Sequence, residues 1–213
     1  MLEKLKQRVL ESLLELPAND LVCLTSGNVS ARDPETELVV IKPSGVPYQK
    51  LKTESLVVVN MEGSVVEGVL KPSSDTASHL FIYSKMKDIM GITHTHSPYA
   101  TAFAAAAMPV PVYFTETAEE FGAEIPCSEF VLIGDQAIGE QVVKYGVKAH
   151  AVILKKHGLF TIGESPEKAV DLAILAENSA YIAWLSLQIG KPLPISEKEI
   201  EALYYRQQNI YGQ

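Results

Sequence analysis

The segment Gly91-Ile92-Thr93-His94-Thr95-His96 joins a strand-like run to two histidines that lie two residues apart. Together with Ile89 and Met90 before it, the run predicts a β-strand over 89–93 that delivers both histidines at its end. Side chains two residues apart on a strand point to the same face, so both imidazoles can reach one ion. Taken alone, the pair fits ordinary polar residues at a strand end equally well.

His157 is the candidate for a third ligand. It follows a second strand-like run, 151–154, and precedes Gly158, a residue that lets backbone segments approach closely. Three imidazoles leave coordination positions open for a substrate, as catalytic zinc sites do. The sequence therefore favours a divalent-metal site on His94, His96 and His157.

Three turns rich in Gly and Ser form a second candidate cluster. They are Gly27-Asn28, Lys42-Pro43-Ser44-Gly45 and Lys71-Pro72-Ser73-Ser74-Asp75. Small hydroxyl residues beside Gly, at strand ends and at a helix start, can donate to phosphate oxygens. Each turn by itself is explained by the ordinary turn preference of Ser, Gly, Asn and Pro. Their occurrence in a chain that also carries a histidine cluster favours anion binding.

Helical and strand-like patterns alternate along the chain, which predicts a single α/β domain over 1–213. Apolar residues at three- and four-residue spacing predict a helix over 2–16, which Pro17 should stop. A cap at Ser165 and a glycine at Gly190 predict a long helix over 165–189. The other expected elements are strands over 38–41 and 151–154, a hairpin over 56–59 and 64–66, helices over 76–86 and 98–107, and a Thr- and Glu-rich loop after Pro111.

Composition limits the classes of function. Hydrophobic residues make up 47% of the chain and charged residues 21%, which predicts a folded globular protein. The net charge of -8 argues against sequence-independent binding to nucleic acid, which needs a basic face. No leader and no run long enough to span a bilayer are visible, so no membrane is expected. Cys23 and Cys127 lie far apart, which fits reduced thiols and a cytoplasmic setting.

A specific resemblance rests on seven motifs in a fixed order. They are Gly27-Asn28-Val29-Ser30, Ile41-Lys42-Pro43-Ser44-Gly45, Lys71-Pro72-Ser73-Ser74-Asp75-Thr76, His94-Thr95-His96-Ser97, Ile125-Pro126-Cys127, Lys156-His157-Gly158 and Tyr211-Gly212-Gln213. With them the chain resembles the class II aldolase and adducin-head family from its first helix to its last residue. The resemblance implies one α/β domain with a central, mainly antiparallel β-sheet flanked by helices.

The resemblance also implies the ligands of the site. Zn²⁺, or another divalent ion such as Mn²⁺ or Co²⁺, would bind the three histidines, with Asp75 as a nearby carboxylate ligand. The implied phosphate and sugar contacts are Gly27, Asn28, Ser44, Gly45, Ser73 and Ser74, with Lys42 close by. The expected partner is therefore a small phosphorylated sugar.

Within the family, the chain is most similar to the epimerases that act on a pentulose 5-phosphate. The family aldolases carry Glu at the position of Asp75, where it serves as ligand and proton shuttle, so Asp75 favours an epimerase. The implied reaction converts L-ribulose 5-phosphate to D-xylulose 5-phosphate by cleaving the C3–C4 bond and re-forming it on the other face.

Two acid/base residues would come from the neighbouring subunit of a fourfold-symmetric homotetramer with active sites at its interfaces. Tyr211 matches the first. The second is an Asp in the family, six residues before Ile-Pro-Cys, where this chain has Glu119, with Glu120 beside it. This is a departure, because Glu places the carboxylate one methylene further out. The other interpretation is that both are solvated loop charges.

Two further functions stay open. One is an aldolase of the L-fuculose 1-phosphate type that releases dihydroxyacetone phosphate. The other is a non-catalytic binding module like the adducin head, against which the three histidines count. His79, four residues after Asp75, could face the site, but a packed core histidine with one partner is the interpretation we keep.

Overall fold

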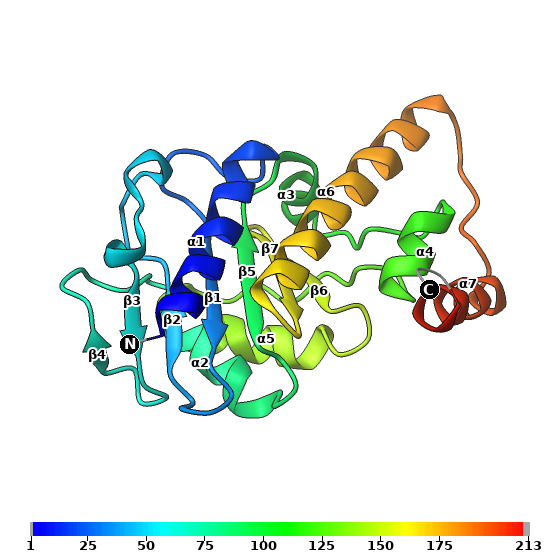
Figure 1. Ribbon diagram of the computed structural model, residues 1–213. Coiled ribbons are helices and arrows are strands. Elements are labelled where there is room, and N and C mark those ends of the chain that lie inside the picture. Colours follow the sequence, from blue (N-terminus) through cyan, green and yellow to red (C-terminus); the bar gives the residue numbers. More distant parts are fainter. Residues whose placement is uncertain (1, 211–213) are drawn as a thin grey trace.

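A seven-stranded sheet in the order β4-β3-β2-β1-β5-β7-β6 forms the centre of the protein, a computed structural model that describes residues 2–210 (Figure 1). Every pair of neighbouring strands is antiparallel. The strands are β1 (Asn28–Arg32), β2 (Val39–Ile41), β3 (Val57–Val59), β4 (Val65–Glu67), β5 (Gly91–Thr95), β6 (Ala151–Leu154) and β7 (Gly158–Gly163). The expected single α/β domain with a mainly antiparallel sheet is therefore confirmed.

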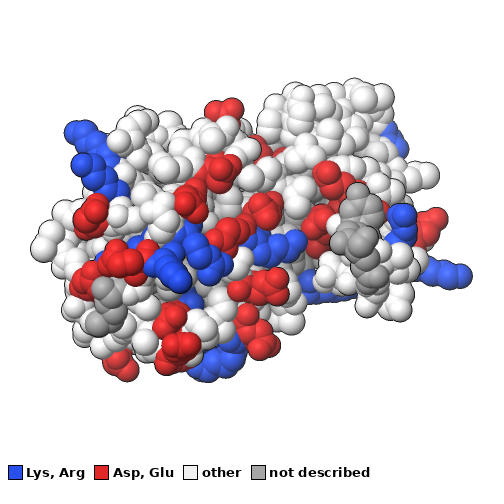
Figure 2. Space-filling model, in the orientation of Figure 1, with Lys and Arg blue, Asp and Glu red and all other residues white. Residues whose placement is uncertain are grey.

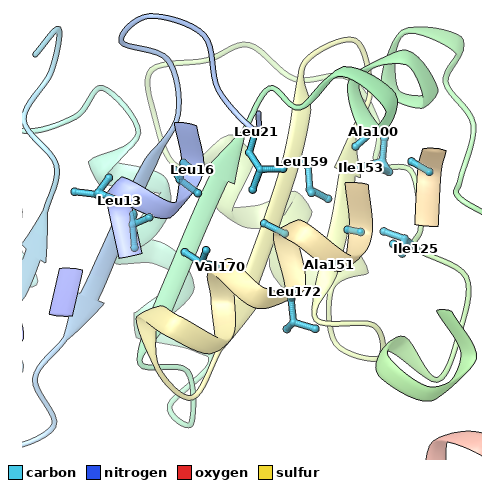
Figure 3. Packing of buried hydrophobic residues seen from close by; sticks show 14 of the residues in the cluster. Leu13, Leu16, Leu21, Ala100, Ile125, Ala151, Ile153, Leu159, Val170 and Leu172 are labelled. Carbon is cyan, nitrogen blue, oxygen red and sulfur yellow. The ribbon is translucent and has the colours of Figure 1, made fainter. Parts of the chain in front are cut away.

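Helices cover both faces of this sheet. The helices are α1 (Glu3–Ala18), α2 (Thr76–Lys85), α3 (Pro98–Ala106), α4 (Thr115–Phe121), α5 (Ala137–Tyr145), α6 (Pro166–Ile189) and α7 (Glu197–Asn209), with short 3-10 turns at Tyr48–Lys50 and Thr53–Ser55. Of these, α4 and α7 lie beside the sheet and pack on each other (Figure 1). Alternate strand residues face opposite layers. Val40 and Val58 join the cluster under α1, α3 and α6, whereas Val39 and Val57 join the cluster under α2 and α5. Figure 3 shows the first cluster, in which Leu13 and Leu16 of α1 and Val170 of α6 lie over the sheet.

The strand register brings distant segments together at one end of the sheet. Asn28, the first residue of β1, pairs with His94 on β5. On the other side of β5, Thr95 pairs with Leu159 of β7, and Gly158 in turn pairs with Leu154 of β6. The turn between β6 and β7, which contains His157, therefore lies beside the end of β5.

Some elements differ from the expectation. The first helix continues through Pro17 to Ala18, because a proline in a last turn loses little beyond its own hydrogen bond. The segment expected as a Thr- and Glu-rich loop contains helix α4, which buries Thr117, Ala118 and Phe121. Strands β1 and β7 and helices α5 and α7 were not predicted from the sequence.

Among the described residues, helix α6 alone is long and apolar enough to cross a membrane by length and composition. A single helix of this kind is weak evidence for a membrane span, so the expectation that no segment spans a bilayer stands. The N-terminal half of α6 packs on the sheet through Ala169, Leu172 and Ala173, and the core helix of a folded domain passes the same test. Its C-terminal end extends beyond the sheet (Figure 1).

Candidate metal centre

Three imidazoles converge at the end of β5. The ligating nitrogens of His94, His96 and His157 all lie within 4.8 Å of one another. His94 Nδ1 lies 2.9 Å from the carbonyl oxygen of Leu159 and donates to it, which leaves Nε2 with its lone pair. That Nε2 is 3.0 Å from Nε2 of His96. His94 is buried, His157 is half-buried and His96 is exposed, so the cluster opens to solvent.

Glycine makes this convergence possible. A Cβ on Gly158 would lie 2.4 Å from the Thr95 carbonyl oxygen, 3.0 Å from His96 Cδ2 and 3.3 Å from His94 Cε1. Gly27 has a φ of +73°, and a Cβ there would lie 2.8 Å from the His94 carbonyl oxygen. Both glycines permit backbone contacts that any larger residue would prevent.

The histidines are held in the form that binds cations. Burial lowers the pKa of His94 well below its usual value, and the neighbouring His157 and His96 lower it further. Burial also lowers the pKa of His96 and of His157, although the nearby Asp75 carboxylate acts in the opposite direction. Neutral imidazoles offer lone pairs, so this donor set fits Zn²⁺ or a similar divalent ion.

Asp75 lines the same pocket but does not belong to the tight group of three imidazoles. Its Oδ2 accepts a 2.7 Å hydrogen bond from Asn28 Nδ2, which also donates to Ser73 Oγ at 3.1 Å. Asn28 Oδ1 is buried and has no hydrogen-bond partner among the described residues. A buried orphan acceptor is costly unless a ligand supplies a donor, so Asn28 is suited to accept a hydrogen bond from a hydroxyl group.

Two of the predicted turns form a cradle next to the histidines. Pro43 and Pro72 form an isolated antiparallel bridge. The Ser44 N–H donates to the Lys71 carbonyl at 2.9 Å, and the Ser73 N–H donates to the Lys42 carbonyl at 3.1 Å. These bonds lock the turns together and leave the serine hydroxyls at the surface of the pocket.

Lys42 is the cation of this cradle. Its side chain is buried, its Nζ donates to the Thr25 carbonyl oxygen at 2.9 Å, and it lies 5.0 Å from the centre of the Tyr48 ring. Burial lowers the pKa of Lys42. An anion in the pocket would favour the charged form and repay the cost of burying it.

Most of the predicted site residues line one pocket of about 170 Å³. These residues are Gly27, Asn28, Lys42, Ser44, Gly45, Ser73, Ser74, Asp75, His94, His96 and His157. Glu119 does not line it; it lies on α4, where its Oε1 is 3.9 Å from Arg206 NH1 of α7. Tyr211 lies outside the described residues. Ile133, an exposed residue before α5, also lines the pocket, and nothing in its local sequence signals this.

With this fold and this site, the chain belongs to the class II aldolase and adducin family, because the family model for the class II aldolase and adducin N-terminal domain matches residues 7–184. The chain is 38% identical to L-ribulose-5-phosphate 4-epimerase UlaF of Salmonella paratyphi B, and the match covers 100% of both proteins. The same identity and coverage hold for the protein of that name from Salmonella typhi.

Solved structures agree with this assignment. An L-fuculose 1-phosphate aldolase superposes with a TM-score of 0.91 at 29% identity, over 96% of each chain. YgbL of Escherichia coli, described as a putative aldolase/epimerase/decarboxylase, has a TM-score of 0.84 at 20% identity, over 95% of this chain and 98% of its own. The second likeness bears on the fold alone.

Proposed function

We propose that the protein is a metal-dependent 4-epimerase that converts L-ribulose 5-phosphate to D-xylulose 5-phosphate. The observation that carries the proposal is the single pocket in which three imidazoles lie beside a cradle rich in Ser and Gly. Family membership and the full-length relatives named as L-ribulose-5-phosphate 4-epimerase support it.

Simple proton abstraction cannot invert C4, because C4 is not adjacent to the C2 carbonyl and its hydrogen is not acidic. Cleavage of the C3–C4 bond permits the inversion but leaves an enediolate, whose negative charge must be stabilised. His94, His96 and His157, with Asp75 as a further ligand, would hold a divalent cation, which would supply the Lewis acid for that charge.

The cradle holds the other fragment. Lys42 and the hydroxyls of Ser44, Ser73 and Ser74 bind the phosphate of the aldehyde and keep it in the pocket. The aldehyde group turns while its phosphate stays bound, and re-addition to its opposite face gives the epimer. Asn28 Oδ1 accepts a hydrogen bond from a sugar hydroxyl and thereby orients the substrate.

An aldolase of the L-fuculose 1-phosphate type is the second candidate, favoured by the structural likeness to an L-fuculose 1-phosphate aldolase. Asp75 counts against it, because the family aldolases have the longer Glu at that position as ligand and proton shuttle. A non-catalytic, adducin-like binding module has no evident use for three neutral imidazoles that open to solvent.

The choice between these functions is tested with two substrates. Protein loaded with Zn²⁺, Mn²⁺ or Co²⁺ is incubated with L-ribulose 5-phosphate, and formation of D-xylulose 5-phosphate is followed. In parallel, L-fuculose 1-phosphate is supplied and dihydroxyacetone phosphate is detected by a coupled assay. We expect epimerisation in the first assay; release of dihydroxyacetone phosphate without epimerisation would assign the aldolase.

We further propose that Glu119 and Tyr211 act in the active site of a neighbouring subunit of a homotetramer. Helix α7, which leads to Tyr211, packs on α4, which carries Glu119, at one end of the molecule (Figure 1). Gln207 of α7 also donates to Glu120 Oε1 at 2.8 Å. Glu119 therefore lies beside the helix that precedes Tyr211 in the sequence, which supports a contribution of both residues by one neighbour.

Exposed apolar residues support the tetramer. Trp184, Leu187 and Ile189 are exposed on the end of α6 that extends beyond the sheet, where Figure 2 shows a mostly uncharged surface. Such patches mark protein–protein contacts.

Elsewhere on this face acidic and basic side chains are intermingled, which supports the expectation that nucleic acid is not a partner. The free thiols Cys23 and Cys127 support a cytoplasmic location.

Replacing Tyr211 by Phe, or Glu119 by Gln, should lower kcat by about 10²- to 10⁴-fold, the usual contribution of an acid/base group. Metal content should be unchanged, because neither residue is a proposed ligand. Tyr205→Phe, at an exposed position of α7, is the matched control and should retain full activity. A normal rate in Tyr211→Phe would remove Tyr211 from the scheme.

Mixing subunits tests whether sites are shared. A His94→Asn protein and a Tyr211→Phe protein are each expected to have strongly reduced activity. Co-refolded, they should form some sites with intact histidines from one subunit and an intact tyrosine from another, and activity should return. If tetramers that contain both kinds of subunit are present and activity does not return, Tyr211 acts in the site of its own subunit.

A further inference from the structure

A buried hydrogen-bonded group lies behind the proposed metal centre. His79 is fully buried, and its Nδ1 is 2.7 Å from Ser30 Oγ, which in turn is 2.8 Å from the Tyr83 hydroxyl. Nε2 of His79 has no hydrogen-bond partner among the described residues. His79 is therefore a buried core histidine with one hydrogen-bond partner, as expected. The proposed reaction gives no role to a histidine at this position.

Strand β1 fastens helix α2 at two points. Asn28 and Ser30 are two residues apart on β1, so their side chains lie on one face. Asn28 binds the Asp75 carboxylate, and Ser30 binds His79 one helical turn later. Asp75 is the N-cap residue of α2, yet its side chain makes no capping hydrogen bond, so the helix itself does not orient the carboxylate.

The ring of His79 also supports the histidine cluster from behind. Its edge packs on Phe160, with ring centroids 5.4 Å apart. Phe160 stacks on His94, with centroids 4.5 Å apart and an interplanar angle of 28°. His79 is therefore connected to His94 through Phe160, and to Asp75 through the first turn of α2.

We infer that His79 is a positioning residue of the metal centre, which acts with Ser30 to hold Asp75 and His94 in place in the pocket that they both line. The inference rests on the proposed metal site but not on the identity of the sugar. Removing a residue that orients a metal ligand typically lowers metal affinity by about 10- to 100-fold.

The test measures the dissociation constant for Zn²⁺ by competition with a chromogenic chelator, in the absence of substrate. His79→Leu keeps a side chain of similar size and removes the bond to Ser30, so affinity should fall by about 10- to 100-fold. His79→Asn places an amide atom near the position of Nδ1, keeps the bond to Ser30 and should recover part of the loss. His79→Gln places its amide near the position of Nε2, which has no hydrogen-bond partner among residues 2–210, and should not recover the lost affinity.

Two controls separate positioning from general stability. His150→Asn makes the same chemical change at an exposed position with a φ of +53°, a conformation that Asn tolerates, and should leave affinity unchanged. The free energy of unfolding of each metal-free variant is measured by urea titration. A purely structural histidine would change that free energy and leave the Zn²⁺ affinity of the folded protein intact.

If His79→Leu does not fold, Ser30→Ala tests the inference instead. This variant removes only the Ser30 oxygen and should weaken Zn²⁺ binding several-fold. Wild-type affinity in folded His79→Leu or in Ser30→Ala would overturn the inference. So would equal losses in the Asn and Leu variants. Failure of the wild-type protein to bind Zn²⁺ would instead count against the proposed metal centre itself.

Discussion

Replacing His94 and His96 together by Asn is expected to remove bound metal and reduce turnover to the background rate. Two of the three converging imidazoles are then lost, and one imidazole with a carboxylate does not retain a divalent ion in competition with water. Without the cation, the charge left by carbon–carbon cleavage has no Lewis acid to stabilise it. Metal content is measured by atomic emission on dialysed protein, and turnover by D-xylulose 5-phosphate formation.

The control for this double variant is His150→Asn, which should retain both metal and activity. Circular dichroism should show an unchanged fold, because both substituted side chains line the pocket at the end of β5 and Asn is smaller than His. Normal turnover in a metal-free double variant would end the proposed mechanism.

Gly158→Ala is expected to lower stability, metal affinity and turnover together. The added Cβ would lie 2.4 Å from the Thr95 carbonyl oxygen, which is backbone and cannot rotate away. The strands must separate by a few tenths of an ångström or more, and His94 and His96 then move with β5. Overpacking of this kind costs about 1–3 kcal/mol of stability. Because metal ligation tolerates little displacement, we expect Zn²⁺ affinity and kcat to fall by at least tenfold.

Two other glycines provide the comparison. Gly190→Ala should be silent, because nothing lies within 4 Å of its Cβ and its φ of 179° suits any residue. Gly91→Ala lies at the opposite end of β5, where its Cβ would be 2.1 Å from the Ser165 carbonyl oxygen. It should lower the unfolding temperature while the folded fraction still binds metal. Equal metal affinity in the Gly158 and Gly190 variants would refute the argument from close packing.

The sequence could predict the histidine cluster because the information was local. The spacing of His94 and His96 on a strand determines their common face, and Gly158 after His157 signals a close backbone approach. That His157 reaches β5 depends on the pairing of β7 with β5, which is a long-range property. From the sequence, only the presence of three histidines and the order of the family motifs indicated that these segments meet.

Strand β1 shows why other parts could not be predicted. Its sequence, Asn-Val-Ser-Ala-Arg, has polar residues that suggest a surface loop, yet all five are buried. Arg32 is accommodated because it donates to the carbonyl oxygens of Tyr83 and Ile89, and Ser30 because it binds His79. These partners lie some 50 residues away, so no local pattern contains them. The position of Ile133 in the pocket could not be predicted either, because the other residues that line the pocket are also distant in sequence.

His94 lies on β5, and His96 and His157 each lie directly next to the end of a paired strand, which has a consequence for how a metal ion would be loaded. Sheet register and a backbone carbonyl hold the rings together before any ion arrives. Chelator treatment should therefore strip the protein without unfolding it, and the empty form should recharge on addition of a different divalent salt. The ion carried in a cell would then be set by which one is most abundant and best matched, and a single preparation could be reconstituted with each in turn.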